Sequence, residues 1–130
     1  MSLLDVFCAR DDEFTLVKAS GEMDYHNFRI LKTSVEQALA DGDRYFIFNL
    51  ADLAYLDSSA LGSLLYHQKR IRDHDGHMVV ISGQALTDIL NLTHLDSYFN
   101  IVESVDAGRR WLVDAKKAPK SNVSNIKTRG

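Results

Sequence analysis

Two short apolar runs limit the folds open to this chain more than any other feature of its sequence. Residues 45–50 (Tyr-Phe-Ile-Phe-Asn-Leu) and 78–82 (Met-Val-Val-Ile-Ser) are each nearly continuous in hydrophobic side chains. Such runs are typical of strands buried on both faces, which occur in parallel sheets covered by helices. Between them, the apolar residues of 59–74 recur at the spacing of one helix face. The chain is therefore expected to contain a strand–helix–strand unit with parallel strands.

The rest of the chain alternates between strand and helix patterns in the same way. Strands are expected at residues 5–10, at 14–20 (ended by Gly21) and at 99–102, and helices at 26–40, 84–93 and 107–118. We therefore predict an α/β protein, with a mostly parallel sheet of four to five strands and about four helices. Its length of 130 residues and its 45% hydrophobic composition suit a single domain.

Charge is unevenly distributed along the chain. Residues 109–130 contain seven basic residues and one acidic residue, whereas the other 108 residues carry a net charge of −9. Residues 1–118 are expected to form the domain, and residues 119–130 a disordered basic tail. An acidic body lacks the positive face that phosphate contacts need, so direct nucleic-acid binding is not expected.

The sequence also bears on where the protein resides. No apolar run approaches the roughly 20 residues of a membrane span, and the first residues lack the basic start and apolar stretch of a secretory signal. The single cysteine, Cys8, cannot form an internal disulfide. We expect a cytoplasmic protein without a membrane span, in which Cys8 is a small apolar core residue.

Three polar stretches follow expected strands, where ligands of open α/β sheets gather. They are residues 21–24, 52–62 and 82–84, and the second is the most informative. One of Asp57, Ser58 and Ser59 is expected to cap the following helix. A phosphate on a hydroxyl there would lie at the positive end of the helix dipole and add about −1.5 to −2 charge near Asp24 and Asp57. Such a modification could switch a docking surface.

The same residues carry a family resemblance. Residues 57–62 (Asp-Ser-Ser-Ala-Leu-Gly) resemble the Asp-Ser-Ser/Thr-Gly-Leu-Gly signature of STAS domains, the anti-sigma-factor antagonists of bacteria. Residues 21–24 (Gly-Glu-Met-Asp) resemble their Gly-Glu-apolar-Asp turn, and residues 49–56 and 78–80 resemble the strands and loop around the serine. The similarity runs from Phe14 to Trp111 in the same order and at similar spacings.

The resemblance implies a binding switch that is not an enzyme and has no catalytic residues, cofactor or metal. Family members bind an anti-sigma factor that is also a serine kinase of the histidine-kinase-like ATPase type, and this binding releases a sigma factor. The kinase phosphorylates the first serine of the motif, the product no longer binds, and a serine phosphatase restores it. By position, the phosphoacceptor is Ser58, and the free protein is expected to be a monomer. The expected partner-binding residues are Asp24, Asp57, Ser58, Ser59, Ala60, Leu61 and Gly62.

Ala60 departs from the family pattern, which usually has glycine at this position. Alanine carries a Cβ that limits close backbone approach. A partner that packs against this position must be adapted to it, or the chain serves another STAS role. The main alternative is an accessory subunit of a lipid-transport ATPase complex or of another assembly unrelated to sigma factors.

Other classes of protein and other kinds of binding site fit the sequence less well. A receiver domain needs a lysine after a late strand, and none lies between Arg72 and Lys116. A serine hydrolase would show a Gly-x-Ser-x-Gly elbow, which is absent. The metal-capable side chains of residues 73–77 are expected to form a solvated turn. Tyr66, Tyr98 and Trp111 are expected to pack in or near the core rather than stack on bases.

Overall fold

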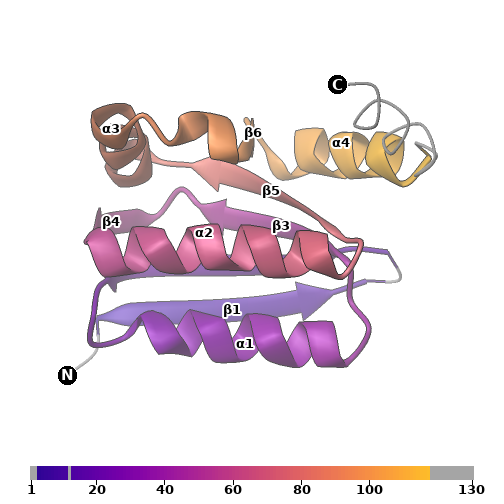
Figure 1. The fold of residues 1–130 in the computed structure, drawn as a ribbon, viewed down its shortest axis with the longest axis horizontal. Coiled ribbons are helices and arrows are strands. Elements are labelled where there is room, and N and C mark those ends of the chain that lie inside the picture. Colours follow the sequence, from indigo (N-terminus) through magenta and orange to yellow (C-terminus); the bar gives the residue numbers. More distant parts are fainter. Residues whose placement is uncertain (1–2, 12, 118–130) are drawn as a thin grey trace.

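The computed structural model describes residues 3–11 and 13–117, and these form one α/β domain (Figure 1). The predicted basic tail, residues 119–130, and the predicted domain boundary at residue 118 lie outside the described residues. The helices are α1 (Phe28–Ala40), α2 (Ser58–Asp73), α3 (Gln84–Thr93) and α4 (Val105–Lys117), with a short 3-10 turn, η1 (Asp96–Tyr98). The predicted fold class, with its four helices, is confirmed.

The sheet has six strands and is mostly parallel. Its strands are β1 (Leu4–Arg10), β2 (Thr15–Met23), β3 (Tyr45–Leu50), β4 (Leu53–Leu56), β5 (His77–Ser82) and β6 (Asn100–Val102). They lie in the order β1-β2-β3-β5-β6, and β4 pairs with the end of β2. Only the β1–β2 pair among these described strands is antiparallel. Strand β6 lies at one edge of the sheet.

Two features of the sheet differ from the predictions. Strand β2 does not end at Gly21 but continues to Met23, because a register shift after Gly21, which has a φ of 97°, lets the chain bend and pair again. Residues 53–56, for which the sequence indicates no separate strand, pair there with β2 as the sixth strand, β4. The bend therefore gives β2 a second parallel neighbour and leads the chain directly into α2.

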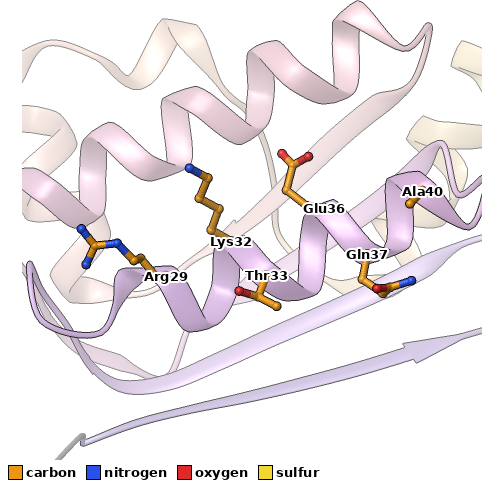
Figure 2. A pocket seen from close by; sticks show the side chains of 6 residues that line it. All are labelled: Arg29, Lys32, Thr33, Glu36, Gln37 and Ala40. Carbon is orange, nitrogen blue, oxygen red and sulfur yellow. The ribbon is translucent and has the colours of Figure 1, made fainter.

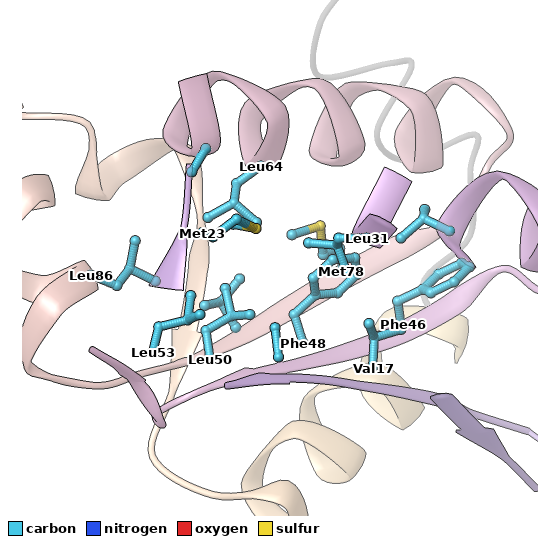
Figure 3. Close-up of a cluster of buried hydrophobic side chains, with 14 of the residues drawn as sticks. Val17, Met23, Leu31, Phe46, Phe48, Leu50, Leu53, Leu64, Met78 and Leu86 are labelled. Carbon is cyan, nitrogen blue, oxygen red and sulfur yellow. The ribbon is translucent and has the colours of Figure 1, made fainter. Parts of the chain in front are cut away.

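Helices cover the two faces of the sheet unequally. Phe46 and Phe48 of β3 point into the larger core cluster with α1, α2 and α3 (Figure 3). Ile47, between them, points to the opposite face, where it packs with Leu112 of α4. Full burial of each such side chain stabilises the fold by about 1.5–3 kcal/mol.

The prediction for Cys8 is wrong. Its side chain is exposed on β1, an edge strand that pairs only with β2. Partial burial and the nearby Asp43 carboxylate raise the pKa of the Cys8 thiol, with burial as the larger cause. The thiol is therefore less reactive than an ordinary exposed cysteine.

Candidate functional site

Two of the three predicted polar stretches meet at the carboxyl end of the sheet. The backbone N–H of Asp57 donates to the carbonyl of Met23, at the end of β2 (3.3 Å). The third stretch, residues 82–84, leads into α3. Gly83 lies so close to Ala51 that a Cβ would be 2.1 Å from the Ala51 carbonyl oxygen. The first two stretches therefore form one surface, and the third supports its edge.

Asp57 holds this surface together with both carboxylate oxygens. Oδ1 accepts from the backbone N–H of Ala60 (2.9 Å) and so caps α2. Oδ2 accepts from the backbone N–H of Tyr25 (2.9 Å), in the loop before α1. The prediction that one of the three polar residues caps the helix is confirmed, and Asp57 is that residue. Such a cap stabilises a helix by about 0.5–2 kcal/mol.

Asp24 shapes the turn that enters α1. Its Oδ1 accepts from the backbone N–H of His26 (2.8 Å), and its carbonyl accepts from that of Phe28 (2.9 Å). The buried Asn27 side chain accepts from the Asp24 N–H and donates to the Glu22 carbonyl, both at 2.9 Å. Sequence reasoning missed Asn27, although an Asp and an Asn spaced three residues apart are a signal of a side-chain-stabilised turn.

Ser58 is the first residue of α2, and its side chain is exposed. Within the described residues, no hydrogen bond engages its hydroxyl. Positions 58, 62 and 66 recur every four residues and share one face of the helix. We call Ser58, Gly62 and Tyr66 the α2 stripe; all three are exposed. The stripe presents a hydroxyl, a position without a side chain and an aromatic ring.

A sequence model of the STAS domain family matches residues 8–108, which is most of the chain. The chain belongs to the STAS domain family. The anti-sigma-B factor antagonist of Staphylococcus aureus is 23% identical over 104 residues, covering 79% of this chain and 96% of that protein.

Solved structures share this STAS fold. An anti-sigma factor antagonist from Mycobacterium paratuberculosis has a TM-score of 0.75 at 22% identity and covers 84% of this chain and 93% of its own. The unphosphorylated anti-sigma factor antagonist SpoIIAA has a TM-score of 0.66 at 14% identity, with coverages of 88% and 100%. At these identities the likeness establishes the fold.

The remaining predicted site residues of the STAS domain differ in exposure. Ser59 is half-buried. Ala60 and Leu61 are buried in the core beneath α2, with 0% and 4% of their surface exposed. The Cβ of Ala60, expected to meet a partner, instead fills core space, so the departure from the family glycine leaves the outer surface unchanged. In contrast, a Cβ at Gly62 would have no atom within 4 Å.

Several tyrosines are exposed, and two of them lie near Asp57 at the start of α2: Tyr25 through its backbone hydrogen bond and Tyr55 two residues earlier in the chain. Tyr25 precedes α1 and Tyr55 lies on β4, with 60% and 51% of their surfaces exposed. Tyr66, within the stripe, is also exposed, as is Tyr98 on η1, whereas Trp111 is half-buried. The expectation of core packing is therefore wrong for Tyr66 and Tyr98, whose side chains point away from the helical faces that pack inward.

The described residues contain neither a cluster of metal ligands nor a membrane-spanning helix. They contain no group of three or more His, Cys, Asp and Glu side chains placed to hold a metal ion. None of the helices within residues 28–117 is long and apolar enough to cross a membrane. What the described site offers chemically is an exposed hydroxyl, fixed carboxylates and aromatic contact area.

Proposed function

We propose that this STAS domain is an anti-sigma-factor antagonist, which binds an anti-sigma factor and thereby releases a sigma factor to direct transcription. The names of the Staphylococcus aureus relative and of the Mycobacterium paratuberculosis and SpoIIAA structures support this role. The domain acts by binding rather than by catalysis. Its docking surface is the α2 stripe with the adjoining loop at Asp24 and Asp57.

The observation that carries the proposal is the state of Ser58. Its hydroxyl is exposed and takes no part in the described hydrogen bonds, while the neighbouring Asp57 caps the helix. A phosphate can therefore be added without disrupting the fold. It would place about −1.5 to −2 charge at the middle of the docking surface, beside two carboxylates. A partner fitted to the free hydroxyl would lose contact and meet repulsion.

The enzymes that set this state act on Ser58 Oγ. A serine kinase of the histidine-kinase-like ATPase type, which is the anti-sigma factor itself, transfers the γ-phosphoryl group of ATP to the hydroxyl oxygen. The hydroxyl proton is released and ADP leaves. A serine phosphatase then hydrolyses the ester with water, which releases inorganic phosphate and returns the free hydroxyl. We propose that both act on the protein in the cytoplasm and that the free protein is a monomer.

Affinity capture of the full chain from its source cell, which recovers the bound proteins, tests the proposal. Mass spectrometry of the peptide that contains Ser58 then shows whether this residue is phosphorylated. We expect recovery of a histidine-kinase-like ATPase and phosphate on Ser58. In calorimetry with that ATPase, Ser58→Ala should bind as the unmodified protein does, and the Ser58-phosphorylated protein should not bind. Ser97→Asp, which adds charge at an exposed serine of η1, should bind normally.

Two outcomes would overturn the proposal. Equal affinity of the phosphorylated and unmodified proteins would exclude the charge switch. Recovery of transporter subunits, with Ser58 unmodified in every growth state, would exclude the sigma-factor role and favour an accessory subunit of a lipid-transport ATPase complex.

A further inference from the structure

Helices α1 and α2 lie side by side and run in the same direction (Figure 1). Two contacts set their register. Lys32 Nζ lies 4.9 Å from the centre of the Tyr66 ring, and one turn later Arg70 Nη2 lies 2.8 Å from Glu36 Oε1. Continuing this register backwards places the first turn of α1, which contains Arg29, level with Gly62. Residues of α1 therefore flank the α2 stripe from Gly62 to Tyr66, and the loop before α1 lies beside Asp57 at the start of α2.

Arg29 and Lys32 are the cations on this flank, and no described carboxylate pairs with either one. The six ion pairs among the described residues involve other cations: Arg10, Lys18, Lys69, Arg70 and Arg109. Aromatic rings hold both side chains instead. The guanidinium of Arg29 lies 4.9 Å from the centre of the Phe28 ring, and Lys32 lies over Tyr66. Stacking orients a cation and leaves its N–H donors free for an anion.

The surface between the two helices has room for another chain. Gly62 presents no side chain, and a Cβ there would meet nothing within 4 Å. On the outer side, a hollow runs along α1, lined by Arg29, Lys32, Thr33, Glu36, Gln37 and Ala40 (Figure 2). The first turn of α2 contains no acidic residue. A segment that lies across Gly62 would thus contact the α2 stripe and lie beside the two cations of α1.

We infer that the docking surface extends from the α2 stripe onto Arg29 and Lys32 of α1, and that its occupant is an acidic segment of the partner protein. The inference rests on the proposed function, because it names the chemistry of the partner bound there. The charges are complementary, because two oriented cations that form no ion pair with a described carboxylate favour a segment that supplies one. The acidic body of residues 1–108 disfavours an extended polyanion, whose phosphates would lie over many carboxylates.

This arrangement also explains how one phosphate on Ser58 could be decisive. The phosphate has the same sign of charge as the acidic segment, so it repels that segment directly. It also offers Arg29, the nearer of the two cations in this register, an anion on its own chain, which competes with the partner for the same donors. Repulsion and competition act in the same direction, and both weaken binding.

The test uses the purified histidine-kinase-like anti-sigma factors encoded in the source genome, each titrated by calorimetry against the full chain. For the one that binds, we expect Arg29→Glu and Lys32→Glu each to weaken binding about tenfold or more and to reduce its salt dependence. Arg110→Glu, at an exposed position on α4, is the matched control and should stay within about twofold. Thermal melting of each variant verifies that it is folded.

The outcomes separate this inference from the proposed function. If the Arg29→Glu, Lys32→Glu double variant binds like the wild type while the Ser58-phosphorylated protein does not bind, the acidic-segment inference is wrong and the proposed function stands. If no anti-sigma factor binds the unmodified chain, both are wrong. If the wild type binds duplex DNA or anionic vesicles and the double variant does not, the cations serve a different polyanion and the inference is overturned.

Discussion

The burial of His67 makes the stability of the domain depend on pH. This side chain is on α2 with none of its surface exposed, and its Nδ1 is buried without a hydrogen-bond partner among the described residues. Its Nε2 lies 3.3 Å from Ser63 Oγ. Burial lowers the pKa of His67 from 6.5 to about 4, with the attraction of Glu36 opposing this shift and the repulsion of Lys32 adding to it. The folded protein therefore holds His67 neutral at neutral pH.

The sign and size of the effect follow from this shift. Below pH 6.5 the unfolded chain binds a proton that the folded protein does not, so stability falls as the pH is lowered towards 4. A pKa lowered from 6.5 to about 4 corresponds to about 3 kcal/mol for the full transition and about 2 kcal/mol by pH 5. This is a large part of the ~5–15 kcal/mol that stabilises a typical domain.

Urea unfolding at pH 7.5, 6 and 5 measures the effect, since most carboxylates stay ionised over this range. The wild type should lose about 2 kcal/mol more between pH 7.5 and 5 than His67→Gln does. His26→Gln, at an exposed position, should keep the wild-type dependence. Burial also lowers the pKa of His77, but His77 is present in all three proteins. An identical pH dependence in wild type and His67→Gln, or an NMR titration that places the pKa of His67 near 6.5, would refute the reasoning.

Two further predictions concern the surface and its support. Gly62→Ala should raise the free energy of unfolding by up to about 1 kcal/mol, because alanine favours a helix and its Cβ has open space. Calorimetry with the anti-sigma factor should show weaker binding by the same variant. A lower free energy of unfolding would contradict the stability prediction. Asp57→Ala should lower the free energy of unfolding by about 1–3 kcal/mol, because two backbone N–H groups lose their acceptor. Asp114→Ala, at an exposed position on α4, is its control, and equal unfolding midpoints for these two variants in urea would contradict the supporting role of Asp57.

Local patterns predicted most of the fold. Helix α2 was expected at 59–74 and spans Ser58–Asp73, because its apolar spacing and polar first turn are both encoded within a few residues. The buried strand at 45–50 is observed as expected. Strand β4 was missed because its four residues, Leu-Ala-Tyr-Leu, are too few to show a period. Its pairing with β2 depends on the bend at Gly21, about 30 residues away.

The sequence predicts which residues form the candidate site, but not which of them face the core or what their side chains contact. The motif placed Asp57, Ser58 and Gly62 together, as the structure does. It could not show that Ala60 faces the core, because one residue in a helix reveals its direction only through the packing of its neighbours. Nor could it reveal the contact of Lys32 with Tyr66, because the register between two helices is set by tertiary packing.

The two hydrogen bonds of Asp57 have a consequence for how fast a partner can be bound. They tie the Tyr25 loop to the start of α2 when the domain folds, although these residues are 32 positions apart. The conformational entropy of this loop is thus lost during folding and not during binding. An encounter with the partner then needs no slow rearrangement of this surface, so association should follow collision frequency and long-range attraction. A phosphate on Ser58 would then change both the rate of formation and the lifetime of the complex, because its charge acts at long range as well as in the contact.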